Sequence, residues 1–307
     1  MTKVFVDGSA GTTGLRILDR LAGRSDLQLL RLPEELRKDP AARADRLNEA
    51  DIVFLCLPDA AAREAVQLIE NENTRVIDTS TAHRTSPDWV YGFAELKGRR
   101  ERIQAARRVA NPGCHASGVI ALAAPLREAG LLPAEARLKC FSLTGYSGGG
   151  KKMIQEYEEE PDPLLSGPRQ YGLGQEHKHL PEMQKECGLE HAPIFCPIVA
   201  PYYAGMEVTI PLFREEVGAG PEEIREVYRS CYREGLIRYA AEDTEGGFLS
   251  AAALEGRDDM EITVRGNEER ILLIARFDNL GKGASGAAIQ NMNLMIGAEE
   301  TLGLELK

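Results

Sequence analysis

The sequence predicts an α/β fold in which a doubly wound parallel sheet is joined to a second domain of α+β character. The 307 residues exceed what one hydrophobic core usually organises, which favours two domains. In the first third of the chain, short apolar strands alternate with amphipathic helices, a pattern typical of a parallel sheet with helices on both faces. After about residue 135, longer strand-like runs follow one another with few helices between them.

The first domain opens with a strand, a glycine turn and a helix. The apolar run Val4–Val6 leads into Gly8–Gly14, and an amphipathic stretch with Leu15, Leu18 and Leu21 follows until Gly23 ends it. The same alternation continues with the strands Leu27–Leu32, Ile52–Leu57 and Val76–Ile77 and the helix Ala60–Ile69.

The second domain is expected to hold a mostly antiparallel sheet. Its strand candidates are Leu138–Leu143, Met206–Phe213, Met260–Val264 and Ile271–Phe277. Their alternating side chains predict one face packed on helices and one face free for other contacts, including those with another subunit. A final helix, Ala287–Ile296, is expected to return to the first domain.

The charge balance argues against a nucleic-acid or membrane partner. The chain has 37 basic and 48 acidic residues and a net charge of −11, which repels polyanions. The most cationic run, Arg99–Arg108, is interrupted by Glu101 and apolar residues and is interpreted as a solvated helix face. No apolar stretch approaches the ~20 residues of a membrane span, and Met1–Val4 leads directly into a strand, so a cytoplasmic location is expected.

The six cysteines are scattered without paired CxxC spacing. We therefore expect neither a disulfide framework nor a zinc knuckle, but reduced thiols, one of which is reactive.

The glycine turn is the candidate cofactor site. Glycines spaced GxxGxxG between a strand and a helix let backbone N–H groups approach a pyrophosphate at the helix N-terminus. The candidate contacts are Gly8, Ser9, Ala10, Gly11, Thr12, Thr13 and Gly14. The alternative is a tight turn that serves packing alone.

The residues at the end of the second strand indicate whether NAD or NADP is bound. That strand runs into Arg31–Pro33 rather than ending in an acidic residue that would bind a ribose 2′-hydroxyl. Arg31, Arg37 and Lys38 could neutralise a 2′-phosphate, so we favour NADP. In the alternative, these are surface charges and Glu34 or Glu35 binds the ribose.

Cys114 is the candidate nucleophile. Asn111–Gly118 precedes the helical run from Val119, so Cys114 lies at or just inside a helix N-terminus, where the dipole favours a thiolate. The other five cysteines lie within strand-like or amphipathic runs and are interpreted as inert.

The proton-transfer partner is sought among five histidines. His179 precedes a helix begun by Pro181 in the second domain and could face the domain cleft, so we favour it as acid/base, with His177 in reserve. His115 follows the cysteine directly and is expected to point elsewhere. A metal site of Cys114, His177 and His179 lacks a fourth ligand at recognisable spacing, so no metal is predicted.

Five motifs resemble the N-acetyl-gamma-glutamyl-phosphate reductase family of arginine biosynthesis. They occur in order along nearly the whole chain: Gly8-x-x-Gly11-x-x-Gly14, Asn111–Cys114, Thr144–Lys151, His177-Lys178-His179-x-Pro181-Glu182 and Asn279-Leu280-x-Lys282–Gly286. The chain length and the segment Ile77–Arg84 favour the short branch of that family.

The resemblance implies a Rossmann-like NADP-binding domain, 1–114 with a C-terminal helix 285–307. It further implies a catalytic, substrate and oligomerisation domain, 115–284, of the glyceraldehyde-3-phosphate dehydrogenase C-terminal type, in a homodimer or homotetramer. NADPH would be the reductant and an acyl phosphate the substrate. The Cys114 thiolate would form a thioester that is reduced to the aldehyde, with His179 as acid/base.

Further contacts are assigned by position. Candidate substrate contacts are Arg84, Ser147, Lys151 and His177, and further cofactor contacts are Pro58, Ser80 and Asn279.

Three rival functions remain. Aspartate-semialdehyde dehydrogenase uses the same chemistry on a smaller acyl phosphate, but the histidine and C-terminal motifs are not expected there. A non-catalytic NADP-binding sensor would not need a cysteine at a helix start. A cysteine hydrolase is disfavoured by the glycine turn.

Overall fold

The computed structural model describes residues 1–159, 162–242 and 245–306. Within them the chain forms two compact units, Met1–Pro112 with Ala284–Leu304, and Gly113–Gly283 with the segment that begins at Glu305. Cys114, assigned by the sequence to the end of the first domain, begins the first helix of the second unit.

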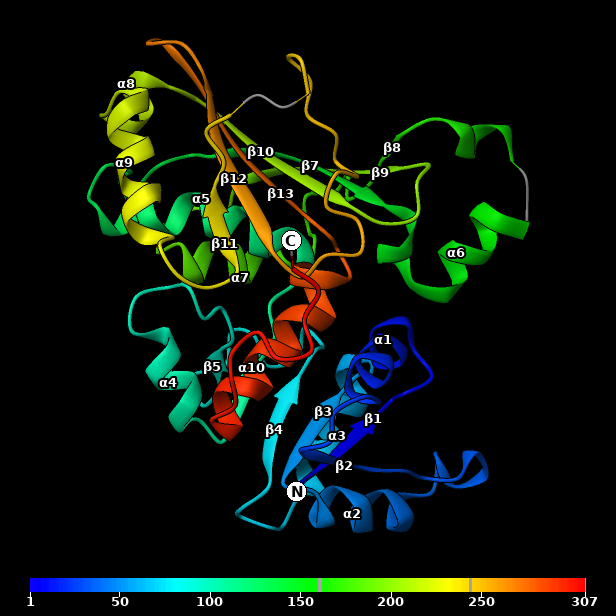
Figure 1. Cartoon of the computed structure of the whole chain (residues 1–307). Coiled ribbons are helices and arrows are strands. Elements are labelled where there is room, and N and C mark those ends of the chain that lie inside the picture. The colour runs from blue at the N-terminus through cyan, green and yellow to red at the C-terminus, as the bar shows by residue number, and fades with distance from the viewer. Residues whose placement is uncertain (160–161, 243–244, 307) are drawn as a thin grey trace. The chain divides into compact units, whose positions relative to one another are not determined.

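The first unit contains a six-stranded parallel sheet with strand order β2-β1-β3-β4-β6-β5. Figure 1 shows β1, β3 and β4 side by side in blue to cyan. The strands are β1 (Thr2–Asp7), β2 (Leu27–Leu30), β3 (Ile52–Leu55), β4 (Arg75–Asp78), β5 (Val90–Tyr91) and β6 (Arg108–Ala110). The helices are α1 (Thr12–Leu21), α2 (Pro40–Glu49), α3 (Asp59–Gln67), α4 (Arg99–Ala105) and α10 (Gly286–Ile296), with a 3-10 turn at Glu34–Leu36.

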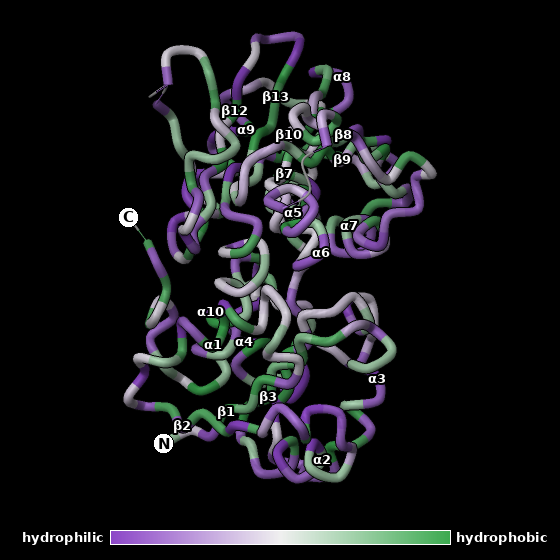
Figure 2. The backbone as a smooth tube through the Cα atoms, turned by 90° about the vertical axis from the view of Figure 1, so that its right-hand side faces the viewer, coloured by the Kyte–Doolittle hydropathy of each residue, from purple (hydrophilic) through white to green (hydrophobic). Residues whose placement is uncertain are grey.

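Helices cover both faces of this sheet. Alternate residues of β1 and β3 point to opposite sides, so that Val4 and Phe54 pack with α1, α4 and α10, whereas Phe5 and Val53 pack with α2 and α3. Figure 2 shows hydrophobic green along β3, in contrast to the mostly purple α2. The predicted doubly wound sheet is confirmed.

The second unit contains a seven-stranded mixed sheet with order β11-β12-β13-β10-β7-β9-β8. The strands are β7 (Lys139–Gly145), β8 (Arg169–Gln170), β9 (Ile194–Ala200), β10 (Met206–Phe213), β11 (Ile237–Tyr239), β12 (Met260–Gly266) and β13 (Arg270–Phe277). The helices are α5 (Cys114–Glu128), α6 (Gly150–Glu159), α7 (Leu180–Glu186), α8 (Arg214–Val217) and α9 (Pro221–Cys231). Shorter turns lie at Tyr146–Gly149, Pro163–Ser166 and Gly281–Ser285.

The sheet is antiparallel over β7, β10, β13 and β12, whereas β7–β9 and β11–β12 are parallel pairs. The second unit holds more helices than the sequence suggested. Helix α9, for example, was not predicted, because polar residues separate its few buried ones. The buried helix α5 packs against β10 and β13, where a Cβ on Gly118 would approach Val208 to 2.4 Å. This face of the sheet therefore anchors the helix that begins at Cys114.

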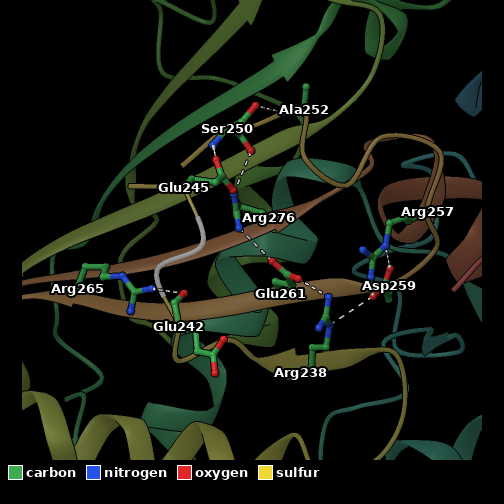
Figure 3. A network of polar contacts seen from close by, with 10 residues as sticks. All are labelled: Arg238, Glu242, Glu245, Ser250, Ala252, Arg257, Asp259, Glu261, Arg265 and Arg276. Atoms are coloured by element: carbon green, nitrogen blue, oxygen red, sulfur yellow. Dashed lines mark hydrogen bonds and ion pairs between the residues drawn. The ribbon is translucent and has the colours of Figure 1, made fainter. Parts of the chain in front are cut away.

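The opposite face carries an ion-pair network over β11, β12 and β13. Arg276, which is buried, pairs with Glu245 and with Glu261, and Glu261 also pairs with Arg238 (Figure 3). Arg276 also donates to the carbonyl of Ser250 at 3.3 Å. The network therefore holds the loop around Glu245 and Ser250 against the sheet.

Candidate active site

Two glycines of the glycine turn are required by the packing of the first unit itself. Gly8 has φ +85°, and a Cβ there would lie 2.2 Å from the carbonyl oxygen of Cys56. A Cβ on Gly14 would lie 2.7 Å from the carbonyl oxygen of Gly8. By contrast, a Cβ on Gly11 would meet only that oxygen at 3.6 Å. Packing within the protein therefore gives no reason for a glycine at position 11.

The start of α1 fits the phosphates of a dinucleotide. Gly11 is the N-cap and supplies no side-chain hydrogen bond to the helix. The buried Thr12 Oγ1 has no hydrogen-bond partner among the described residues. An uncapped helix N-terminus beside a spare hydroxyl offers the donors and partial positive charge that a pyrophosphate needs.

Pro58 and Ser80 lie at the same edge of the sheet as this turn. β1, β3 and β4 are parallel, and Gly8, Pro58 and Ser80 follow their carboxyl ends, where ligands bind in sheets of this class. Ser80 donates from its hydroxyl to Asp78 at 2.8 Å.

The basic residues predicted to select NADP lie on the surface between β2 and α2. Arg37 and Lys38 are exposed, and Arg37 approaches Glu34 at 3.4 Å. Arg43, which was not among the predicted residues, forms a partly buried ion pair with Asp7 at the carboxyl end of β1, at 2.7 Å. Only the fold reveals this pair, because no local pattern links the two positions.

Cys114 is the first residue of α5 and is partly exposed. The N-cap residue before it is Gly113, which makes no side-chain hydrogen bond to the helix. A Cβ on Gly283 would lie 2.9 Å from that of Cys114, so glycine lets the C-terminal motif approach the thiol. All six cysteines are free thiols. Burial raises the pKa of Cys56 to about 12 and also raises those of Cys140 and Cys187, so these three are poor nucleophiles.

Glu182 contacts both His179 and the backbone of the residue before Cys114 within the second unit. His179 is buried at the N-cap of α7, and its Nε2 lies 4.0 Å from Glu182 Oε1. The other oxygen of Glu182 accepts a hydrogen bond from the backbone N–H of Gly113 at 3.1 Å. The sequence analysis quoted Glu182 but gave it no role, although its i+3 spacing from His179 on a helix was an available signal.

His177 supports His179 from the same turn. Its Nδ1 accepts a hydrogen bond from the backbone N–H of His179 at 3.2 Å, and the two ring centroids are 4.7 Å apart. His177 is half-buried, whereas His179 is buried and lies 4.0 Å from the carboxylate of Glu182.

His115, which follows Cys114 directly, lies beside His177 and His179 in the second unit. Its ring centroid lies 5.6 Å from that of His177 and 5.7 Å from that of His179. Its ring nitrogens contact Ser142 and Tyr171, which reach it from β7 and from the loop after β8. No sequence pattern indicated these two residues, because their proximity depends on the sheet.

Of the other predicted substrate contacts, Ser147 and Lys151 belong to the second unit and Arg84 to the first. Ser147 is buried and accepts a hydrogen bond from Asn279 at 3.0 Å, so a predicted substrate contact and a predicted cofactor contact are neighbours. Lys151 is exposed at the start of α6. Arg84 belongs to the first unit and is buried, and it donates to the carbonyls of Asn111 and Thr79 at 2.9 and 3.0 Å.

The described part of the chain has neither a metal-binding cluster nor a membrane-spanning helix. It contains no group of three or more His, Cys, Asp or Glu side chains placed to hold a metal ion. None of its helices combines the length and the apolar character needed to cross a bilayer.

Two family models match the chain. Residues 21–106 match the semialdehyde dehydrogenase NAD binding domain, and residues 114–279 match the semialdehyde dehydrogenase dimerisation domain. These ranges agree with the parallel sheet and the mixed sheet described above.

Curated relatives align along nearly the whole chain. The N-acetyl-gamma-glutamyl-phosphate reductases of Brucella canis and of Brucella abortus strain S19 are each 49% identical over 306 residues, which cover 96% of this chain and 99% of each relative.

Solved structures share the fold at low sequence identity. Aspartate semialdehyde dehydrogenase II of Vibrio cholerae, complexed with ASA, is 17% identical, with a TM-score of 0.74 over 97% of this chain and 98% of that one. Aspartate semialdehyde dehydrogenase with NADP from Candida albicans is 16% identical, with a TM-score of 0.65 over 98% and 99%.

Proposed function

Because the chain belongs to the N-acetyl-gamma-glutamyl-phosphate reductase family, we propose that it reduces N-acetyl-L-glutamyl 5-phosphate in arginine biosynthesis. The products are N-acetyl-L-glutamate 5-semialdehyde and phosphate. The observation that carries the proposal is the 49% identity to enzymes of that name over 96% of the chain. The histidine–carboxylate pair beside the helix that begins at Cys114 supports it.

Cys114 is the proposed nucleophile. The N-terminus of α5 favours its thiolate, which attacks the acyl carbonyl and displaces phosphate to leave a thioester on the sulfur. Backbone N–H groups of the first turn of α5, which have no acceptor within the helix, are suited to stabilise the oxyanion.

His179 is the proposed acid/base, and Glu182 its positioning residue. His179 Nε2 lies 4.0 Å from the carboxylate of Glu182, and His179 is proposed to protonate the oxyanion as the aldehyde forms and to take the proton back in the reverse direction. Since Glu182 also holds the backbone of Gly113, one buried side chain positions the acid/base relative to the start of α5.

The cofactor proposed is NADPH, which supplies the hydride when bound. Gly8–Gly14 would hold its pyrophosphate, with Pro58 and Ser80 at the same sheet edge. Asn279 remains a proposed cofactor contact, and Ser147, Lys151, His177 and Arg84 remain proposed substrate contacts. In this assignment, the unit built around the parallel sheet is the cofactor domain and the unit that begins with α5 is the catalytic domain.

Arg37 and Lys38 are proposed to recognise the 2′-phosphate. Replacing both with alanine should raise the KM for NADPH more than the KM for NADH, because only NADPH carries that charge. Initial-rate kinetics with both cofactors measure this, and equal changes in the two KM values would contradict the assignment.

We further propose that the chain forms a homodimer or homotetramer through the sheet face opposite α5. Phe141, Ile194 and Leu272 share this face and are 44%, 57% and 38% exposed. Exposed apolar side chains on one face of a sheet are available for contact with another subunit. The match of residues 114–279 to a dimerisation domain supports a second copy as the occupant.

Phosphate-dependent reduction of NADP tests the proposed reaction in reverse. N-acetyl-L-glutamate 5-semialdehyde should be a substrate, and aspartate semialdehyde should be turned over at least about 100-fold less efficiently. The Cys114→Ser protein should bind NADPH within a few-fold of the parent and show no turnover. Preference for aspartate semialdehyde would favour the rival dehydrogenase, and no turnover of either aldehyde would favour the non-catalytic sensor.

A further inference from the structure

Gln175 has a strained backbone in the loop that carries the two motif histidines. In the described part of the chain it is the one residue other than glycine with a positive φ, at +55°. This left-handed conformation is disfavoured for any residue with a Cβ, and residues held in it are concentrated at functional sites. The loop, residues 171–179, joins β8 to α7 and contains His177 and His179.

The side-chain amide of Gln175 pairs with both backbone groups of Phe195 in β9. Its Nε2 donates to the carbonyl of Phe195 at 2.8 Å, and its Oε1 accepts from the N–H of Phe195 at 2.9 Å. Phe195 is buried, and the N–H and carbonyl groups of a buried residue require partners. The two hydrogen bonds therefore offset the strain of the left-handed backbone.

This amide extends the edge of the sheet beyond the point where the chain leaves it. Strand β8 pairs with β9 only at residues 198–199, and the N–H of Tyr171 then donates to the carbonyl of Pro197 at 3.0 Å. Two residues further back along β9, the amide of Gln175 takes the place of a neighbouring strand. The loop is therefore fastened to β9 at two successive positions.

The residue held by this amide packs against the histidines. The ring centroid of Phe195 lies 5.1 Å from that of His177 and 5.2 Å from that of His115. His177 Nδ1 in turn accepts a hydrogen bond from the backbone N–H of His179. Each step from Gln175 to His179 is therefore a direct contact within the second unit.

We propose that Gln175 is a positioning residue. By fastening residues 171–179 to β9, it holds the rings of His177 and His179 in the arrangement that proton transfer requires. The proposal rests on the proposed function in taking these histidines as the site of proton transfer.

Two variants separate positioning from stability. Gln175→Gly and Gln175→Ala both remove the amide, but only alanine keeps the backbone strain. The glycine variant should therefore melt at a higher temperature than the alanine variant. Both should lower kcat equally, by roughly 10–100-fold, the loss expected when a reacting group is displaced by up to about 1 Å.

Thermal melts and initial rates of phosphate-dependent NADP reduction measure these effects. The KM for NADP should not change, because the proposed cofactor turn lies in the other unit. Gln175→Gly should fold, since residue 175 is exposed and glycine adopts its backbone without strain.

Diethyl pyrocarbonate, which acylates accessible neutral imidazoles, tests the position of the histidines without turnover. In Gln175→Gly, the half-buried His177 should be modified several-fold faster than in the parent, as read by peptide mass spectrometry in the absence of substrate.

Asn48→Ala is the matched control. The amide of Asn48 also bonds backbone groups through both of its atoms, but in the first unit, where it donates to two carbonyls and accepts from two N–H groups, each at 2.8 Å. This variant should lower the melting temperature without changing kcat or the rate of modification at His177.

An unchanged kcat in Gln175→Gly would overturn the proposal, as would an unchanged rate of modification at His177. A kcat that followed the melting temperature across the glycine and alanine variants would show a structural role alone and would also overturn it. If the parent turned over neither aldehyde, the proposed function would fail, and the modification rate would still decide whether Gln175 holds the histidines in place.

Discussion

Among single side chains, the two histidines of the His177–Glu182 motif have different surroundings. His179 Nε2 lies 4.0 Å from the carboxylate of Glu182, whereas His177 Nδ1 accepts a hydrogen bond from the backbone N–H of His179. His179→Asn should therefore lower kcat by roughly 10²–10⁴ with little change in KM. His177→Asn should be milder.

Steady-state kinetics of both variants, with circular dichroism to establish folding, measure this difference. If His177→Asn were the more damaging to kcat, the acid/base assignment would move to His177. If neither mattered, the proton donor would lie outside this motif.

Neutral His115 predicts a pH dependence of stability. Its folded pKa of about 3 lies below the ordinary value of 6.5, so between these values the unfolded chain binds the extra proton. The contribution of His115 to stability is therefore complete above pH 6.5 and is lost as the pH falls toward 3, by up to about 1.4 kcal/mol per unit.

Urea denaturation at several pH values, on the parent and on His115→Asn, isolates this contribution. The variant should be less stable at pH 7, but its stability should fall less steeply between pH 6.5 and 4. Parallel curves would show that His115 is not held neutral by burial.

At the scale of the elements, we expect the turn between β1 and α1 to contain one glycine needed for stability and another needed for cofactor binding. A Cβ on Gly14 would collide with the backbone of Gly8, whereas a Cβ on Gly11 would meet nothing closer than 3.6 Å. Gly14→Ala should therefore lower the free energy of unfolding by about 1–3 kcal/mol. Gly11→Ala should leave stability unchanged and weaken NADPH binding about 10-fold or more, because the methyl group occupies space left for the phosphates.

Calorimetry of unfolding and fluorescence titration with NADPH measure the two effects separately. Gly23→Ala is the control, since a Cβ there has no neighbour within 4 Å. NADPH affinity of Gly11→Ala equal to that of the parent would argue against a pyrophosphate at this turn.

For the whole molecule, the sheet face opposite α5 predicts the oligomeric state. Phe141→Asp should place a charge in the proposed interface and shift the mass measured by light scattering toward the monomer. Leu164→Asp is the control, because Leu164 is 73% exposed in a turn outside the sheet. A Phe141→Asp protein with the mass of the parent would place the interface elsewhere.

The local features of this protein could be predicted from sequence alone. The pattern of apolar residues located β1 to β4, β7, β10, β12 and β13, because it reports burial directly, but it did not locate β5, β6, β8, β9 or β11. The helix that begins at Cys114 was predicted because Gly113 and the apolar run after the cysteine are local signals. The motifs identified the family for the same reason, since each is contiguous or nearly so.

Tertiary structure alone decided which distant side chains meet. Ser142 and Tyr171 lie 27 and 56 residues from His115, and sheet pairing brings them to its two ring nitrogens. The ion pair of Asp7 with Arg43 and the hydrogen bond from Gly113 to Glu182 have the same origin. A sequence pattern shows which residues of a helix or strand are buried. The distant residues that they contact across the core depend on strand order and helix packing. For this reason the sequence could suggest Cys114 as the nucleophile that we propose, but it could not predict the contacts between the distant side chains.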